Sequence, residues 1–217
     1  MTRFRAAVFD LDGVLADSAV AHFAAWKRIA DDLSIPFDAE ANEALKGVDR
    51  MGSLRHILAL GNVTLPEAEM VAIATRKNGY YLDAVAAMTP ADLLPGAAAL
   101  VARARALGMK TAIASASRNA PTLLARLGIA SDFDFIADAG AVAASKPAPD
   151  IFLACTEALG VAPGDAIGFE DSAAGIEAIL AAGMIAVGIG VASTLARAHI
   201  VFPTTAEADL DAVIARF

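Results

Sequence analysis

From residue 94 onward, short apolar segments alternate with longer segments that have the periodicity of helices. The candidate helices are 97–107, 120–127, 150–159, 173–182 and 206–215. The candidate strands are 110–115, 135–137, 166–170 and 186–189, joined by one near the N-terminus at 5–11. Strands that alternate with helices predict a parallel sheet with helices on both faces.

The stretch between the first two candidate strands contains only helical patterns. These helices are expected at 18–33, 39–45, 51–60 and 66–82, with a short one near 90–92. A helical block that interrupts an α/β pattern indicates an insertion. We therefore predict an α/β fold, in which a Rossmann-like parallel sheet core (1–15 and 93–217) carries an inserted all-helical cap domain (16–92).

Composition narrows the classes of partner. Although 57% of the residues are hydrophobic, no apolar run reaches the roughly 18 residues that a spanning helix needs. The net charge of −8 disfavours nucleic acid and anionic membrane. A single cysteine, Cys155, cannot form an internal disulfide and is expected in the core. We therefore expect a cytoplasmic protein with neither a nucleic-acid nor a membrane partner.

Asp10-Leu-Asp12-Gly13 directly follows the first strand. Two carboxylates in this spacing can share a metal ion, one acting as a nucleophile on phosphorus and the other as a general acid and base. Gly13 allows a tight turn beside a bound anion. An ordinary pair of surface aspartates at a turn is the competing interpretation, because the motif is short.

Further polar residues follow later strands. Ser115 could hold a phosphate oxygen, or it could serve only as a helix cap beside Asn119, itself a candidate N-cap. Lys146 lies in a loop that the following proline stiffens. It could neutralise charge that develops on phosphorus, or it could be a solvated surface lysine. Glu170 and Asp171 offer oxygen ligands suited to Mg²⁺, or they could stabilise a helix N-terminus that Ser172 caps.

The order of these motifs along the chain resembles the haloacid dehalogenase superfamily. The resemblance implies that Asp10 is the nucleophile and a Mg²⁺ ligand. Asp12 is then the general acid and base and offers its backbone carbonyl to the metal. It also implies that Glu170 and Asp171 complete the metal site. Ser115 and Lys146 are implied to bind the transferring phosphoryl group.

Several cap residues form a further pattern: His22, Trp26, Lys46-Gly-Val48, Arg50, Ser53 and Arg76-Lys-Asn78. Together with the core stretches 114–117, 142–152 and 168–176, this pattern resembles the β-phosphoglucomutase branch of the superfamily. That resemblance implies a mutase that interconverts β-D-glucose 1-phosphate and glucose 6-phosphate through a phosphorylated aspartate and a β-glucose 1,6-bisphosphate. The substrate-binding residues that it implies are His22, Trp26, Lys46, Gly47, Arg50, Ser53, Lys77, Ser117 and Asn119.

Several cap residues keep a second interpretation. Arg50 and Lys77 could hold the non-transferring phosphate, or each could be a solvated helix charge. Trp26 lies on the apolar stripe of its helix and could be a core residue. His22 could sense substrate near the hinge or position Asp12, or it could be a hydrogen-bonded structural histidine.

Other functions stay open for comparison. A sugar-phosphate phosphatase would use the same nucleophile with a cap that admits water to the active site. A dehalogenase, or a phosphonate-cleaving enzyme, would have no use for the acid at Asp12. A catalytically silent sugar-phosphate sensor is the remaining alternative, although every proposed catalytic position is filled. The expected partner is a hexose phosphate, and the expected oligomeric state is a monomer.

Overall fold

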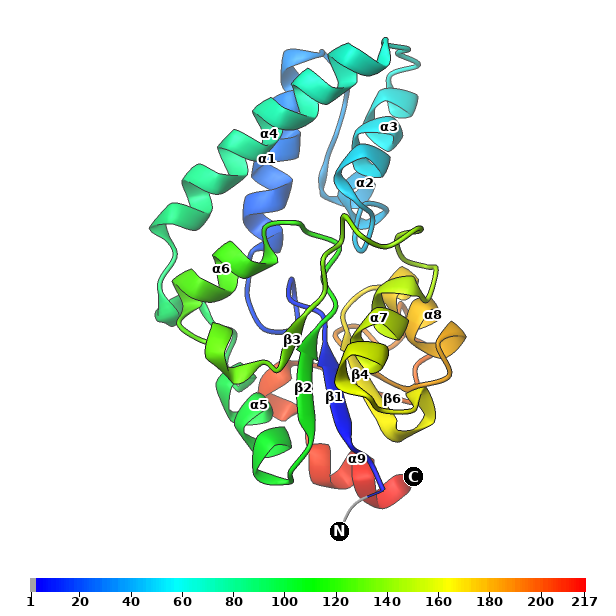
Figure 1. The fold of residues 1–217 in the computed structure, drawn as a ribbon. Coiled ribbons are helices and arrows are strands. Elements are labelled where there is room, and N and C mark those ends of the chain that lie inside the picture. The colour runs from blue at the N-terminus through cyan, green and yellow to red at the C-terminus, as the bar shows by residue number, and fades with distance from the viewer. Residues whose placement is uncertain (1–2) are drawn as a thin grey trace.

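The computed structural model describes residues 3–217. Within this range six parallel strands form one sheet in the order β3-β2-β1-β4-β5-β6 (Figure 1). The strands are β1 (Ala6–Phe9), β2 (Lys110–Ile113), β3 (Phe135–Ile136), β4 (Ala166–Glu170), β5 (Ile185–Ile189) and β6 (Ile200–Phe202). Every residue of β1 and β4 is buried, which explains why both strands read as continuous apolar runs. The predicted parallel α/β core is confirmed.

Helices cover both faces of this sheet (Figure 1). They are α5 (Ala97–Ala106), α6 (Ala120–Leu127), α7 (Asp150–Leu159), α8 (Ala173–Ala181) and α9 (Leu210–Arg216). Buried residues of α5, α6 and α9 share one hydrophobic cluster with Phe9 and Phe169, whereas those of α7 and α8 share another with Val8. Cys155 on α7 is buried in the second cluster, as expected for a core residue. Across residues 3–217, no helix has the length and apolar character needed to cross a membrane.

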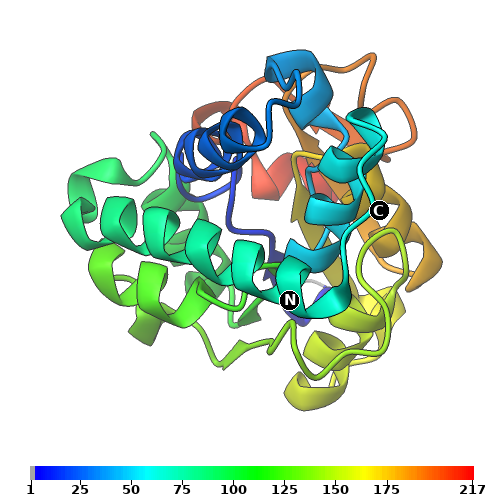
Figure 2. The same ribbon diagram turned by 90° about the horizontal axis from the view of Figure 1, so that it is seen from above.

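Four helices are inserted between β1 and β2 and gather above one end of the sheet (Figure 1). They are α1 (Ala19–Asp32), α2 (Ala39–Glu43), α3 (Arg50–Leu60) and α4 (Glu67–Ala87). They have a hydrophobic cluster of their own, which includes Trp26, Ile29 and Ile57. Seen from above, the long α4 lies beside α6 of the core (Figure 2). The helical insertion is confirmed.

The two chain segments that join the insertion to the sheet run side by side. Ala16 and Leu93 form an antiparallel bridge, and the amide of Leu94 donates to the carbonyl of Leu15 at 2.9 Å. Motion of the insertion relative to the sheet would therefore bend both segments at one place. This pairing supports the division into domains 1–15 with 93–217 and 16–92, which stays a prediction.

Most predicted helices and strands end within two residues of the observed bounds, and three differences are larger. The edge strand β6 was not predicted, because its three half-buried residues are too few to show a period. The last helix begins at Leu210 rather than at 206, because Thr205–Glu207 form a separate 3₁₀ turn and Asp209 caps the helix. Helix α4 continues five residues beyond the predicted end, to Ala87.

Strand order places the site. β1 lies between β2 and β4, so the chain leaves it toward opposite halves of the sheet. In such sheets ligands bind beyond the carboxyl ends of the strands at this point. Asp10 follows β1 and Glu170 ends β4, so the two carboxylates meet at that crevice, under the inserted helices.

Candidate active site

Three carboxylates meet at the crevice. Asp10, Glu170 and Asp171 each place an oxygen within 4.8 Å of the others. The Asp10 amide donates to the carbonyl of Phe169 at 2.9 Å, which fixes the end of β1 against β4. Burial and the neighbouring Glu170 raise the pKa of Asp10 well above its usual value and that of Asp171 to about 7. This group can hold a metal ion through hard oxygen ligands.

Lys146 lies inside this cluster. Its side chain is buried, and Nζ donates to Asp10 Oδ1 at 2.6 Å and to Glu170 Oε2 at 2.8 Å. Burial alone would lower the pKa of Lys146, but the two carboxylates outweigh it and raise that pKa. Interpreting Lys146 as a solvated surface lysine is therefore wrong. The ammonium offsets part of the negative charge beside Asp10.

Glu170 is held by the start of α8. Its Oε1 accepts from the amide of Ser172 at 3.1 Å and from Ser172 Oγ at 2.7 Å. Ser172 Oγ in turn accepts from the Gly175 amide at 3.0 Å, which confirms the predicted N-cap. A Cβ atom on Gly175 would lie 2.1 Å from Glu170 Oε2, so only glycine leaves room for this carboxylate.

Asp12 faces the insertion. It accepts a hydrogen bond from Ser18 Oγ, and its Oδ2 lies 3.9 Å from His22 Nε2. Burial raises the pKa of Asp12, and the bond from Ser18 opposes that rise. A carboxyl group with a raised pKa can be protonated near neutral pH, so it can act both as a general acid and as a general base. Gly13 turns the chain at φ +79°, and a Cβ atom there would meet Asp171.

Lys77 is buried behind His22. Its side chain is 2% exposed, Nζ lies 2.7 Å from His22 Nδ1, and the rings of Trp26 and Tyr81 flank the ammonium. Burial and the charge of Arg50 lower the pKa of Lys77 to about 7. The interpretation of Lys77 as a solvated helix charge is therefore wrong.

His22 is enclosed by the same group. Its ring stacks on Tyr81 with centroids 4.0 Å apart, and burial lowers its pKa well below the usual value. A protonated Lys77 can only donate to Nδ1, so a neutral His22 then carries its proton on Nε2, which faces Asp12. Within residues 3–217, Nε2 is closed to water and has no hydrogen-bond partner. His22 is thus placed to interact with Asp12.

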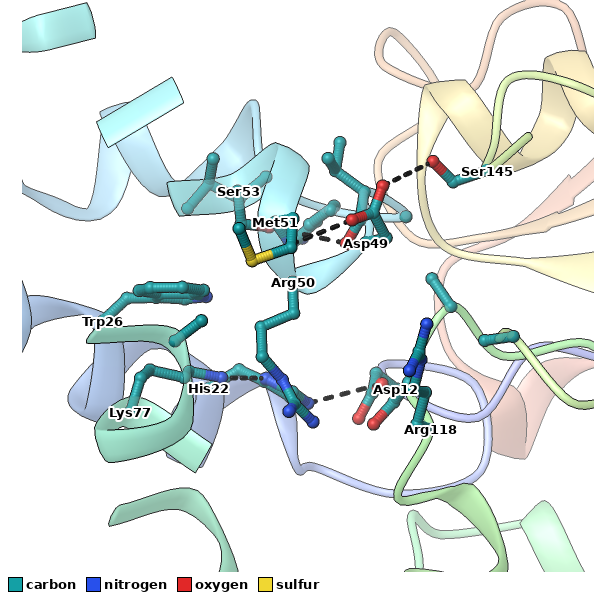
Figure 3. Close-up of a pocket in the computed structure, with 18 of the residues that line it drawn as sticks. Asp12, His22, Trp26, Asp49, Arg50, Met51, Ser53, Lys77, Arg118 and Ser145 are labelled. Atoms are coloured by element: carbon teal, nitrogen blue, oxygen red, sulfur yellow. Dashed lines mark hydrogen bonds and ion pairs between the residues drawn. The ribbon is translucent and has the colours of Figure 1, made fainter. Parts of the chain in front are cut away.

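A cavity of about 480 Å³ lies between the insertion and the sheet domain (Figure 3). It brings together most of the side chains that the sequence singled out. Those that line it are Asp10, Asp12, His22, Trp26, Lys46, Gly47, Arg50, Ser53, Lys77, Ser117 and Asp171. Trp26 is both buried in the hydrophobic cluster of the insertion and part of the cavity wall, so its two interpretations are compatible.

Four predicted residues are not in the cavity wall: Ser115, Asn119, Lys146 and Glu170. Ser115 is buried, and its Oγ accepts from the Ser117 amide at 3.1 Å. Asn119 occupies the predicted N-cap position of α6, but its side chain makes no capping hydrogen bond. Its Nδ2 instead donates to Asn78 Oδ1 on α4 at 2.8 Å, which links the core to the insertion.

Two guanidinium groups enter the cavity from opposite sides (Figure 3). Arg50 comes from the first turn of α3, and Arg118 from the loop after β2. Burial and the charge of Arg118 lower the pKa of Arg50. Among the described residues neither arginine forms a salt bridge, so an anion from outside can satisfy both. Arg118 was missed, although it stands directly between the predicted Ser117 and Asn119.

The loop before α3 touches the carboxylate cluster. Lys46 Nζ lies 3.5 Å from Asp171 Oδ2 and 3.1 Å from Glu43 Oε2. Gly47 has φ +75°, and a Cβ atom there would be 3.2 Å from Ser172 Oγ. A residue other than glycine would push this loop away from the core. The insertion thus closes directly over the cluster.

Comparison with known proteins supports this assignment of the fold. A β-phosphoglucomutase of Bacillus subtilis strain 168 is 44% identical over 209 residues, which are 95% of this chain and 92% of that protein. A fructose-1-phosphate phosphatase, YqaB of Escherichia coli K12, is 32% identical over 86% of this chain and 97% of its own length. The crystal structure of a β-phosphoglucomutase from Clostridium difficile superposes with a TM-score of 0.96 at 40% identity, covering 98% of this chain and 96% of that one.

The sequence model of the haloacid dehalogenase-like hydrolases matches residues 4–183. That match covers most of the chain and includes the carboxylate cluster, Lys146 and the inserted helices. The resemblance inferred from the motifs is confirmed. The chain belongs to the haloacid dehalogenase-like hydrolase family.

Proposed function

We propose that this chain is a Mg²⁺-dependent β-phosphoglucomutase, which interconverts β-D-glucose 1-phosphate and glucose 6-phosphate through a β-glucose 1,6-bisphosphate. The observation that carries the proposal is a cavity that joins the candidate nucleophile to two arginines. Asp10 lines the cavity and accepts a hydrogen bond from Lys146 behind it, and Arg50 and Arg118 enter the cavity from opposite sides. The 44% identity to a β-phosphoglucomutase supports the same substrate.

The proposed metal site uses Asp10, Glu170, Asp171 and the backbone carbonyl of Asp12. The donor set fits Mg²⁺, because three buried or half-buried carboxylates converge with their oxygens within 4.8 Å. Mg²⁺ bound there would offset the negative charge shared by the carboxylates and the phosphoryl group.

Asp10 attacks the phosphorus of the bisphosphate, and the bond from phosphorus to the sugar oxygen breaks. Asp12 gives its proton to that leaving oxygen, so the products are a phosphorylated Asp10 and a sugar monophosphate. In the return step a hydroxyl of the reoriented sugar loses its proton to Asp12 and attacks phosphorus, and the bond from phosphorus to the Asp10 carboxylate breaks, which regenerates the free carboxylate. Lys146 and Ser115 hold the phosphoryl oxygens in both steps.

Both phosphates of the intermediate need a site, because either end of the sugar can face Asp10. Arg50 and Arg118 supply the second site, since planar guanidinium groups match phosphate oxygens. The side chains that surround the space for the sugar in this proposal are those of Lys77, His22, Lys46, Ser53 and Ser117, and Asn119 acts from outside the wall through its bond to Asn78. Trp26 and Gly47 complete its walls.

The insertion must exclude water during these steps, because water would hydrolyse the phosphorylated Asp10. Contacts of Lys46 and Gly47 with the core close the cavity on one side. The hydrogen bond from Asn119 to Asn78 holds α4 of the insertion against the core. A cytoplasmic location and a monomeric state stay predictions.

The function is tested with β-glucose 1-phosphate, a trace of β-glucose 1,6-bisphosphate and Mg²⁺. We expect glucose 6-phosphate to accumulate, measured by a coupled dehydrogenase assay. Asp10→Asn should lower the rate at least about 10³-fold, because the amide is a poor nucleophile. A rate unchanged by this substitution would refute the mechanism.

The phosphatase is the second candidate, because a relative 32% identical to this chain is a sugar-phosphate phosphatase. A phosphatase would use the same catalytic centre but would transfer the phosphoryl group from Asp10 to water. Release of inorganic phosphate without glucose 6-phosphate in the same assay would establish the phosphatase and end the mutase proposal.

A further inference from the structure

One carboxylate of the insertion makes contacts in two directions (Figure 3). Asp49 Oδ1 accepts from the amides of Met51 at 2.9 Å and Gly52 at 3.0 Å, which caps helix α3. Asp49 Oδ2 accepts from Ser145 Oγ at 2.9 Å. Ser145 belongs to the core, 96 residues further along the chain, so this bond joins the two parts of the molecule.

Each end of the bond is next to a residue of the proposed mechanism. Arg50 is the first residue of α3 and directly follows Asp49. Lys146 directly follows Ser145, and its Nζ lies 2.6 Å from Asp10 Oδ1. The Asp49–Ser145 bond thus ties the backbone that presents an arginine of the second phosphate site to the backbone that presents the lysine beside the nucleophile.

Capping alone does not explain an aspartate here. Serine caps a helix about as well as aspartate, but its shorter side chain leaves no second oxygen for a partner. The three hydrogen bonds to Asp49 stabilise its charged form and lower its pKa against the effect of burial. A hydrogen bond to a charged acceptor is also stronger than one between neutral groups.

We propose that Asp49 and Ser145 are positioning residues, whose hydrogen bond holds the insertion closed over the core so that Arg50 and Lys146 act on one ligand. This inference rests on the proposed mutase function. Without the bond, the two phosphate sites would no longer keep a fixed separation, and water would reach the phosphorylated Asp10 more often. Neither residue itself touches the reacting atoms.

Three variants separate the roles of Asp49. Ser145→Ala removes the bond from the core side and leaves the cap of α3 intact. Asp49→Ser keeps a capping oxygen but is too short to reach Ser145. Ser145→Thr retains the hydroxyl and tests rescue. We expect the first two to raise KM for β-glucose 1-phosphate about tenfold with a smaller change in kcat, and to raise the ratio of free phosphate to glucose 6-phosphate to a similar extent.

The double variant distinguishes one shared contact from two separate defects. It should match either single variant in both quantities, because the same bond is lost. Ser145→Thr should restore wild-type values. Unchanged KM and product ratio in both single variants would overturn the proposal. The proposal would also be overturned if the fold-changes of the two single variants multiplied in the double variant, because two independent defects combine in that way.

A readout without substrate separates this inference from the function on which it rests. Hydrogen exchange of the segments 46–49 and 143–147 should become several-fold faster in Ser145→Ala and in Asp49→Ser, while the amides of Met51 and Gly52 stay protected. If the wild type makes no glucose 6-phosphate but exchange changes in this way, the mutase function fails and the contact survives. If the wild type is an active mutase but exchange in Ser145→Ala and in Asp49→Ser equals that of the wild type, the mutase function survives and the proposed role of the contact is overturned.

Discussion

The amine of Lys77 is almost completely buried. The side chain is 2% exposed and lies between His22 and the rings of Trp26 and Tyr81. Burial disfavours the charged amine, and Arg50 adds repulsion. The pKa of Lys77 is therefore lowered from 10.5 to about 7, so its charge changes near the pH of a cell.

The first prediction concerns this charge and stability. Between pH 7 and 10.5 the unfolded chain holds a proton on Lys77 that the folded chain has lost, so this residue's contribution to folding stability rises with pH across that window. Relative to Lys77→Met, the wild type should gain up to about 1.4 kcal/mol per pH unit. Urea unfolding of both proteins at pH 6.5, 8 and 9.5, without metal, measures the difference.

Lys27→Met on α1 is the control for that experiment, because the Lys27 side chain is 41% exposed and forms a surface ion pair with Asp31. Its difference from the wild type should stay nearly constant over the same range of pH. A difference between wild type and Lys77→Met that does not change with pH would contradict the buried setting of the amine.

The second prediction concerns Arg118. Arg118→Ala should raise KM for β-glucose 1,6-bisphosphate about 10- to 100-fold, because hydrogen bonds to a charged group contribute roughly 1.5–3 kcal/mol. Phosphorylation of Asp10 by acetyl phosphate should change little, since that donor has no second phosphate. Arg105→Ala is the control, because Arg105 is exposed and donates to the backbone carbonyl of Asp132, away from the cavity. Equal KM values for Arg118→Ala and the wild type would remove Arg118 from the site.

At the scale of elements, β4 and α8 act as one support for the metal site. Glu170 ends the strand, and Ser172, which caps the helix, holds one of its oxygens. Close packing depends on the glycine in the first turn of α8. A Cβ atom on Gly175 would lie 1.9 Å from the carboxyl carbon of Glu170.

The third prediction follows from that contact. Gly175→Ala must displace Glu170 from Lys146 and Ser172, and we expect a loss of Mg²⁺ affinity of at least about tenfold, as for other groups that orient metal ligands. Isothermal titration with Mg²⁺ measures it. The control is Gly79→Ala in α4, where a Cβ atom meets nothing within 4 Å. This control should stabilise the protein by about 0.5–1 kcal/mol and leave the affinity unchanged. Wild-type affinity in Gly175→Ala would contradict the predicted displacement.

At the scale of the whole molecule, metal and cap act on the same cluster. Asp171 belongs to the carboxylate group and also pairs with Lys46 of the insertion. Buried carboxylates that repel one another destabilise the folded chain unless a cation compensates them. A bound cation would therefore stabilise the molecule as a whole and not only its site.

The fourth prediction is that Mg²⁺ raises the melting temperature. A ligand present at 100 times its Kd stabilises by about 2.7 kcal/mol, which for a chain of this size corresponds to roughly 5–10 °C. EDTA should reverse the shift. Asp171→Asn should abolish most of it, whereas Asp83→Asn, an exposed position on α4, should keep it. Identical melting curves in Mg²⁺ and EDTA would contradict the assignment of the site.

The sequence by itself determined the sheet, the insertion and the carboxylate cluster. Buried parallel strands leave continuous apolar runs, and helices leave a period of 3.6 residues, so both appear in a local window. Asp10, Glu170 and Asp171 were predictable because each comes directly after a strand or ends one. Strand ends in a parallel sheet meet at one edge whatever lies between them.

Only the tertiary structure decided what surrounds the single side chains. Lys77 is 55 residues from His22, Arg118 is far in sequence from Arg50, and Ser145 is 96 residues from Asp49. Local windows contain no trace of such pairs. From the sequence alone, Lys77 is expected to be solvated like most lysines on helices. Its burial results from the packing of α1 against α4. Burial and the approach of charges depend on distances through space, and those arise only when the insertion lies on the sheet.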